Sequence, residues 1–332
     1  IIHHPSSIIH QPSTNNHQPS TINHQPTTNN QILKTLISII GSTGIGKTKL
    51  AIEIAKHFDT EIISCDSRQF FKEMKIGTAT PSEEELAQVK HHFVGNLSVT
   101  DYYSIGQYET DALQKLEEIF AEKDIAVLVG GSMMYEKAVA EGLNDLPESN
   151  AENQEKLQKI WDEEGLEKLQ QILENLDEEY YKVVHKENPR RLLRAIDVIW
   201  QTGRKYSEII TEPKNKRNFR VVRIGIKAPR EIMYERINQR VDKMLENGLL
   251  EEVKALTTYK NLVPLQTVGY TEIFKYLDGT WDLDFAVEEI KKNSRRYAKR
   301  QETWNKKVEN VTWLNYDYSA EDLKYVLENQ IL

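Results

Sequence analysis

The chain has 332 residues, of which 39% are hydrophobic and 28% charged, as is typical of a soluble protein with a real hydrophobic core. No apolar run approaches the ~20 residues that cross a bilayer, and the single cysteine, Cys65, excludes an internal disulfide and a cysteine-rich zinc site. We therefore expect a cytoplasmic protein without membrane contacts, and its net charge of −8, if evenly spread, would argue against nucleic acid as a partner.

Residues 1–30 differ from the rest of the chain because they contain no Lys, Arg, Asp or Glu. The segment His-Gln-Pro-Ser-Thr-Asn-Asn, which begins at His10, recurs with small changes from His17 and from His24. A proline in every copy and the lack of an apolar seam exclude a coiled coil. Such a segment buries too little surface to offset its ordering entropy, so we predict a disordered low-complexity tail.

From Gln31 onward the pattern becomes an alternation of strands and helices. Leu36–Ile40 is short, apolar except at Ser38 and rich in β-branched residues, as expected of a buried parallel strand. The predicted elements that follow are a helix over Lys47–Phe58, a strand over Glu61–Cys65, a helix over Tyr108–Ala121 and a strand over Ile125–Val129. This order predicts a parallel sheet with right-handed crossovers.

Between about Pro147 and Pro213 the strand pattern stops, and Glu, Lys, Gln and Leu predict several helices. A strand-like run returns at Val221–Ile226, followed by helical stretches over Glu231–Leu256, Thr271–Leu277 and Phe285–Trp304. We therefore predict an α/β fold in which residues 31–146 and 218–318 form a P-loop NTPase-like parallel sheet core flanked by helices. Residues 147–217 form an all-helical insertion in this prediction.

The first chemical motif lies between the first predicted strand and its helix, which is the context required of a phosphate-binding loop. Glycines let backbone N–H groups converge on phosphate oxygens, and the helix that follows adds its positive end. Lys47 supplies a charge and Thr48 offers a hydroxyl to Mg²⁺. We predict that eight residues bind a di- or triphosphate: Gly41, Ser42, Thr43, Gly44, Ile45, Gly46, Lys47 and Thr48.

Two further motifs follow buried strands, at the edge of a parallel sheet where ligands bind. Asp66-Ser67-Arg68-Gln69 follows the second predicted strand, and Gly130-Gly131-Ser132-Met133-Met134-Tyr135 follows the third. By position alone, Asp66 could be a magnesium ligand, a general base or a helix cap. No Asp stands at 130–132, where P-loop hydrolases usually place a second metal anchor, which weakens an ATPase interpretation.

These motifs, in this order, resemble those of the bacterial tRNA dimethylallyltransferases, also called tRNA isopentenyltransferases. The resemblance extends from Leu36 to Trp304, which is most of the chain. The segments that carry it are residues 41–48, 66–69, 76–82, 130–135, 188–195, 228–230, 266–270 and 298–304.

The resemblance implies transfer of a dimethylallyl group from dimethylallyl diphosphate to N6 of the adenosine 3′-adjacent to a tRNA anticodon. The phosphate-binding loop then holds this donor in place of ATP, with Mg²⁺ as cofactor. Asp66 matches the base that removes a proton from the adenine amine. Thr43 matches a contact near the reacting carbon, and Arg230 would stabilise the leaving diphosphate together with Lys47 and Thr48-bound Mg²⁺.

The resemblance also implies that the adenine is flipped out of the anticodon stem-loop into the site. The residues expected to contact the tRNA are Asp66, Ser67, Arg68, Gln69, Ser132, Arg190, Arg191 and Arg194. Ser132 stands where the family usually has Thr, and Gln154 where relatives often have Arg. We expect the enzyme to act as a monomer.

The charge is unevenly distributed, which removes the objection to a nucleic-acid partner. Residues 141–187 contain 14 acidic and 5 basic residues, whereas residues 286–307 contain 8 basic and 3 acidic ones. The basic stretch suits an RNA backbone, although a solvated helix face is its plain alternative.

Three alternatives remain open at this point. The first is prenyl transfer to a free adenine nucleotide, although the insertion and the basic stretch favour tRNA. The second is a P-loop kinase for a small metabolite. The third is a non-catalytic RNA-binding protein with a relic P-loop.

Overall fold

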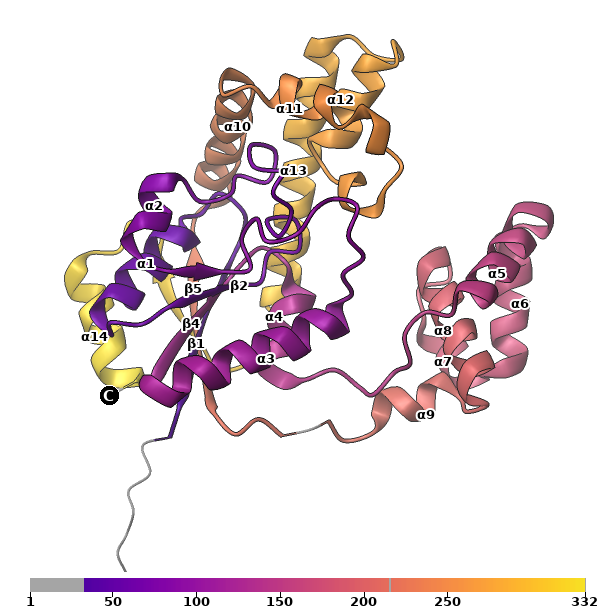
Figure 1. Ribbon diagram of the computed structural model, residues 1–332, viewed down its shortest axis with the longest axis horizontal. Coiled ribbons are helices and arrows are strands. Elements are labelled where there is room, and N and C mark those ends of the chain that lie inside the picture. Colours follow the sequence, from indigo (N-terminus) through magenta and orange to yellow (C-terminus); the bar gives the residue numbers. More distant parts are fainter. Residues whose placement is uncertain (1–32, 215, 332) are drawn as a thin grey trace, which may run out of the picture. The chain divides into compact units, whose positions relative to one another are not determined.

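The computed structural model describes residues 33–214 and 216–331 (Figure 1), so the predicted tail of residues 1–30 lies outside the described part of the chain. Its centre is a parallel six-stranded sheet with the strand order β3-β2-β4-β1-β5-β6. The strands are β1 Thr35–Gly41, β2 Ile62–Ser64, β3 His91–His92, β4 Ile125–Val129, β5 Arg220–Lys227 and β6 Val311–Asn315. The predicted α/β class with a parallel sheet is confirmed.

Helices cover both faces of this sheet (Figure 1). The helices of the core are α1 Lys47–His57, α2 Glu83–Gln88, α3 Ile105–Glu122, α4 Met133–Glu141, α10 Arg230–Glu246, α11 Leu249–Ala255, α12 Tyr270–Leu277, α13 Leu283–Asn305 and α14 Ala320–Gln330. Two 3₁₀ turns lie at Thr257–Tyr259 and Val263–Leu265. One hydrophobic cluster joins side chains of α3, α4 and α13 to the sheet, and a second joins side chains of α1 and α14 to it. All seven residues of β1 are buried between these layers.

Three predictions about the elements need correction. The strands β3 and β6 were not predicted, because they are short edge strands: β3 is two half-buried histidines, and β6 contains exposed side chains that interrupt any apolar run. The single helix predicted over Glu231–Leu256 is two helices, α10 and α11. Gly248 has a φ of 96°, which starts a new helix direction.

Between Ala151 and Thr211, a stretch described throughout, all the regular elements are helices, as predicted. They are α5 Ala151–Glu164, α6 Leu166–Leu176, α7 Glu178–Val183, α8 Pro189–Thr202 and α9 Tyr206–Thr211. These helices share their own hydrophobic cluster, which includes Leu157, Leu169, Leu192 and Ile196. The boundaries of the insertion at 147 and 217 stay a prediction.

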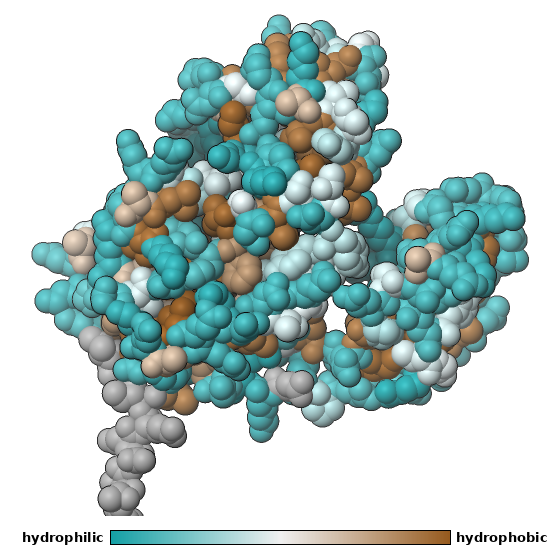
Figure 2. All heavy atoms as spheres, viewed as in Figure 1, coloured by the Kyte–Doolittle hydropathy of each residue, from teal (hydrophilic) through white to brown (hydrophobic). Residues whose placement is uncertain are grey.

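Hydrophilic side chains predominate on the face of the molecule drawn in Figure 2, with smaller groups of hydrophobic residues, drawn in brown, among them. Among residues 33–214 and 216–331, no helix combines the length and the apolar character that crossing a membrane requires.

Candidate active site

The phosphate-binding loop connects β1 to α1, as its sequence predicts. Gly44 and Gly46 have φ values of 75° and 113°, which turn successive N–H groups toward one side of the loop. One large cavity of about 630 Å³ is lined by five of the eight predicted residues, namely Thr43, Gly44, Gly46, Lys47 and Thr48. The other three, Gly41, Ser42 and Ile45, line a separate cavity beside the end of β5.

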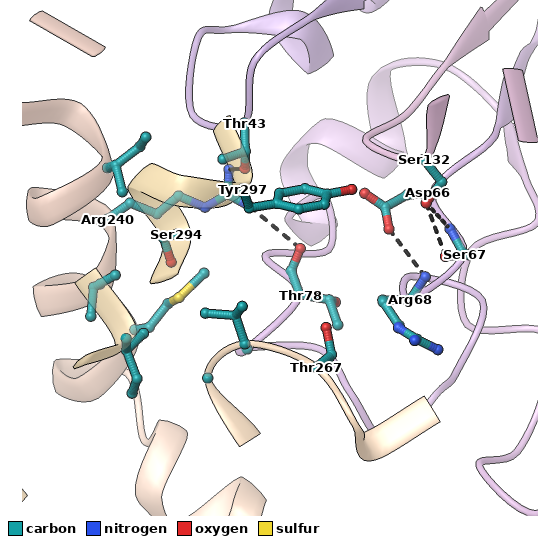
Figure 3. A pocket seen from close by; sticks show the side chains of 17 residues that line it. Thr43, Asp66, Ser67, Arg68, Thr78, Ser132, Arg240, Thr267, Ser294 and Tyr297 are labelled. Atoms are coloured by element: carbon teal, nitrogen blue, oxygen red, sulfur yellow. Dashed lines mark hydrogen bonds between the residues drawn. The ribbon is translucent and has the colours of Figure 1, made fainter. Parts of the chain in front are cut away.

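A second cavity of about 260 Å³ adjoins the first, because Thr43, Asp66 and Arg240 line both (Figure 3). The larger cavity is polar and rich in basic side chains, including Lys47. The smaller one has a polar end near Asp66 and an apolar wall. That wall consists of Ile237, Val241, Met244, Val268 and Ile290. A ligand with an anionic end and a small apolar end therefore fits across the junction.

Asp66 lies two residues after the end of β2, and its carboxylate is held by two backbone donors. Its Oδ1 accepts a hydrogen bond from the N–H of Arg68 at 3.1 Å, and its Oδ2 accepts one from the N–H of Gly131 at 3.1 Å. The Asp66 carboxylate faces the hydroxyl end of Tyr297 (Figure 3). Burial, with the Asp66 charge as a second cause, raises the pKa of Tyr297 well above its usual range, so the phenol stays protonated.

The ends of β2 and β4 are joined by two serines. The Oγ of Ser132 accepts from the N–H of Ser67 at 2.9 Å and lies 2.9 Å from the Ser67 Oγ. Gly130 permits this close approach, because a Cβ there would lie 2.4 Å from the carbonyl carbon of Cys65. Both serines and Arg68, which were predicted to contact tRNA, line the smaller cavity.

Gln69 is the fourth residue of this motif, and its amide is already engaged within the protein. Its Nε2 donates to the carbonyl oxygens of Thr78 at 3.2 Å and Ala79 at 3.1 Å. Gln69 lines the larger cavity. These two bonds engage its Nε2, so a contact with tRNA would have to use its Oε1.

The structure does not bring Arg230 into this group. Arg230 is the exposed first residue of α10 and lines neither of the two cavities. Arg240, further along the same helix, lines both cavities; its Nη1 lies 3.5 Å from the Thr43 Oγ1 and its Nη2 lies 3.4 Å from the Thr78 carbonyl oxygen. Burial lowers the pKa of Arg240, and the nearby Asp66 charge opposes that shift.

Two residues of α13 also belong to the site and were missed by the sequence analysis. Gln301 is 1% exposed; its Oε1 accepts from the N–H of Thr43 at 2.7 Å and its Nε2 donates to the Gly131 carbonyl at 2.8 Å. The hydroxyl of Tyr297 donates to the same carbonyl at 2.8 Å. The signal for Gln301 was present, because it lies in the motif at residues 298–304.

Besides Arg68, three arginines were predicted to contact tRNA; these three lie on α8 and differ from one another. Arg190 and Arg191 are exposed and line a shallow surface pocket. Arg194 is bound internally: it donates to the fully buried Asp197 at 3.1 Å and to the carbonyl of Pro147. Its first role is therefore structural. Gln154 is half-buried on α5.

Lys47 folds back onto the loop that carries it, where its Nζ donates to the Ser42 carbonyl at 2.9 Å. Burial and, to a smaller extent, the charge of Arg240 lower the pKa of Lys47 to about 8, although the charge of Asp66 opposes the shift. The ammonium is thus charged at neutral pH but loses its proton within the accessible alkaline range.

We expect the affinity for inorganic diphosphate to fall between pH 8 and 9.5. A diphosphate binds the charged lysine, so binding takes up a proton above pH 8, and the affinity then decreases by up to about tenfold per pH unit. Isothermal titration calorimetry between pH 6.5 and 9.5 measures this slope. Lys47→Arg is the matched control, because a guanidinium keeps its charge over this range. The pH profile of its diphosphate affinity therefore contains only the ionisation of the ligand. Equal slopes in the two proteins would contradict the assignment.

The oxygen atoms around the larger cavity suit a magnesium ion. Thr48, Ser64 and Asp66 line it with hydroxyl and carboxylate oxygens, the hard donors that Mg²⁺ prefers when substrate phosphates complete its shell. Within residues 33–214 and 216–331 there is no cluster of three or more His, Cys, Asp or Glu that could hold a metal by itself. The protein can thus offer Mg²⁺ a partial site that a bound diphosphate would complete.

Comparison with known proteins identifies the family of this chain. A family model described as IPP transferase matches residues 69–308. A tRNA dimethylallyltransferase of Christiangramia forsetii is 49% identical over 296 residues, covering 89% of this chain and 98% of the relative. A tRNA dimethylallyltransferase of Bacteroides fragilis is 48% identical over 293 residues, covering 88% of this chain and 97% of the relative.

Solved structures of similar enzymes also match this chain. A tRNA isopentenylpyrophosphate transferase of Bacillus halodurans is 33% identical with a TM-score of 0.64, covering 89% of this chain and 94% of that one. A eukaryotic dimethylallyltransferase, solved acting on tRNA, is 26% identical with a TM-score of 0.76, covering 89% of this chain and 79% of that one. With its phosphate-binding loop, its Asp66 rim and these matches, the chain belongs to the IPP transferase family, that of the tRNA dimethylallyltransferases.

Proposed function

We propose that this protein transfers a dimethylallyl group from dimethylallyl diphosphate to N6 of the adenosine 3′-adjacent to a tRNA anticodon. The observation that carries this proposal is the junction of two cavities at Thr43, Asp66 and Arg240. A phosphate-binding cavity that opens onto a small, partly apolar one suits a donor whose carbon group leaves while its diphosphate stays behind.

The donor is expected to lie across this junction. Its diphosphate binds the N–H groups of the phosphate-binding loop and the Lys47 ammonium, and its C5 tail enters the smaller cavity. In the reaction the bond between C1 and the bridging oxygen breaks, so negative charge grows on the diphosphate. Lys47 and Arg240 line the cavity where that charge develops and stabilise it.

Asp66 is expected to act on the acceptor. As the new bond forms between N6 and C1, the nitrogen must lose a proton, and the Asp66 carboxylate lies in both cavities, where it can accept that proton. Its two backbone hydrogen bonds fix the orientation of the carboxylate before the substrate arrives. The adenine would enter past Ser67 and Ser132, whose hydroxyls line the same cavity.

Mg²⁺ is part of the proposal. Thr48 would hold it together with oxygens of the donor, and when bound it would neutralise charge on the leaving diphosphate. We further propose that the enzyme works as a monomer in the cytoplasm. Cys65, the sole cysteine, is buried and free, which suits a reducing compartment.

The decisive experiment incubates the protein with radiolabelled dimethylallyl diphosphate, Mg²⁺ and unmodified tRNA. We expect label at the adenosine next to the anticodon, none in a tRNA with guanosine at that position, and none when EDTA removes the metal. Free AMP is the second acceptor to test. Label on AMP alone would contradict tRNA as substrate, and label in the presence of EDTA would contradict the metal.

The exposed arginines of α8 should contribute to tRNA binding in a way that Arg194 does not. Arg190→Ala and Arg191→Ala should each weaken tRNA binding and reduce the slope of log K against log salt by about 0.7 to 1, as for a lost phosphate contact. Arg194→Ala should instead lower the free energy of unfolding by roughly 1–3 kcal/mol, because it removes a partner from the buried Asp197. Filter-binding at several salt concentrations and urea unfolding separate the two effects. Identical behaviour of the three variants would contradict this division.

A further inference from the structure

The segment Ile76–Ser82 was part of the family resemblance, yet no role has been assigned to it. It belongs to the loop that follows the 66–69 motif, and two of its residues, Gly77 and Thr78, line the smaller cavity (Figure 3). The Thr78 carbonyl accepts hydrogen bonds from Gln69 and from Arg240. The position of this loop therefore affects a side chain at the junction of the two cavities.

One carboxylate on α11 fixes the loop. The Oε2 of Glu252 accepts from the N–H groups of Lys75 at 2.9 Å and Ile76 at 2.8 Å, and its Oε1 accepts from the N–H of Gly77 at 2.9 Å. The Tyr270 hydroxyl donates to the same Oε1 at 2.7 Å. A carboxylate has about four lone-pair positions, so four donors saturate it.

The tyrosine connects this carboxylate to the opposite wall of the cavity. Tyr270 is fully buried and begins α12 directly after Thr267–Gly269, a segment that lines the smaller cavity. Its ring packs so closely on the loop that a Cβ on Gly77 would lie 2.5 Å from it. The absence of a side chain at Gly77 allows the two walls to approach.

The orientation of the Arg240 guanidinium depends on the position of this loop. The two polar contacts found for its guanidinium among the described residues are the Thr43 hydroxyl and the Thr78 carbonyl, at 3.5 and 3.4 Å. The first belongs to the phosphate-binding loop and the second to the loop that Glu252 fixes. A shift of the Thr78 carbonyl would leave the guanidinium anchored on one side only.

We propose that Glu252 is a positioning residue for the transfer reaction: with Tyr270 it fixes the loop at residues 75–78 against the 267–269 wall and so orients Arg240 toward the leaving diphosphate. This inference rests on the proposed function. It assigns Glu252 no contact with substrate and no proton transfer.

Glu252→Gln tests the proposal, because an amide keeps the size of the side chain but presents an NH₂ group to backbone N–H donors. We expect kcat/KM for dimethylallyl diphosphate to fall about tenfold to a hundredfold, with tRNA affinity unchanged. Glu251→Gln is the matched control, since it makes the same change at the exposed neighbouring position and should stay within about twofold of wild type. A wild-type enzyme without activity would refute the proposed function. An active wild type with equal Gln variants would refute this inference alone.

A double-mutant cycle separates positioning from general stabilisation of the fold. If Glu252 acts through Arg240, adding Glu252→Gln to Arg240→Ala should lower kcat/KM for dimethylallyl diphosphate by less than a further factor of about two. If the two residues act independently, the losses of the single variants should multiply. Multiplying effects would overturn the proposal. If Glu252→Gln does not fold, Tyr270→Phe takes its place in the cycle, because it removes only the hydroxyl and should cost about threefold to tenfold by itself.

Discussion

Asp66→Asn should lower kcat for dimethylallyl transfer about 10²- to 10⁴-fold, which is the range for loss of a positioned general base. The amide cannot take the proton from N6. Its NH₂ group also replaces one of the two oxygens that accept hydrogen bonds from the N–H groups of Arg68 and Gly131. Single-turnover kinetics with saturating tRNA and donor measure the chemical step directly.

The matched control for Asp66→Asn is Glu85→Gln. Glu85 is a second carboxylate lining the larger cavity, and its structural role is to accept from the N–H of Ser82 at the start of α2, which a glutamine oxygen can also do. We expect this variant to retain activity within about threefold of wild type. If both variants lose activity equally, the effect of Asp66 is one of cavity charge rather than proton transfer. If Asp66→Asn keeps its rate, another group is the base.

The sheet was predictable where its strands are fully enclosed. Ile125–Val129 is a continuous apolar run, and Leu36–Ile40 is interrupted only by Ser38; both are central strands, β4 and β1. The edge strand β6 has five residues, of which only Leu314 is buried, so its sequence resembles that of many loops. The break at Gly248 was missed because apolar spacing continues on both sides of it, and the change of direction depends on one backbone angle.

The site was predictable to the extent that it is built from strand ends. Asp66 and Ser132 lie two and three residues after the ends of β2 and β4, so the rule that ligands bind at the carboxyl edge of a parallel sheet was enough to place them together. Arg240, Gln301 and Glu252 come from helices α10, α13 and α11. Their side chains reach the site only through the tertiary packing of those helices, and local patterns do not specify that packing. The motif at residues 298–304 pointed to Gln301 as part of a segment but not to its role.

The assignment of the phosphate-stabilising arginine is the point at which sequence and structure differ most. Arg240→Ala should lower kcat/KM for dimethylallyl diphosphate about 10²- to 10³-fold, the cost of removing one group that stabilises charge in the transition state. Arg230→Ala should lower the same kcat/KM less than about threefold, because the side chain is exposed and lies outside both cavities. Steady-state kinetics with a fixed tRNA concentration compare the two variants.

Arg240→Lys adds a test of geometry to this comparison. A lysine keeps the positive charge but cannot reach the Thr43 hydroxyl and the Thr78 carbonyl at once, as the guanidinium does with its two Nη atoms. If charge alone matters, the lysine variant should recover most of the activity lost in Arg240→Ala. If orientation matters, as the two contacts indicate, it should recover less than about tenfold. A large loss in Arg230→Ala with little in Arg240→Ala would reverse the assignment and return the leaving-group role to the start of α10.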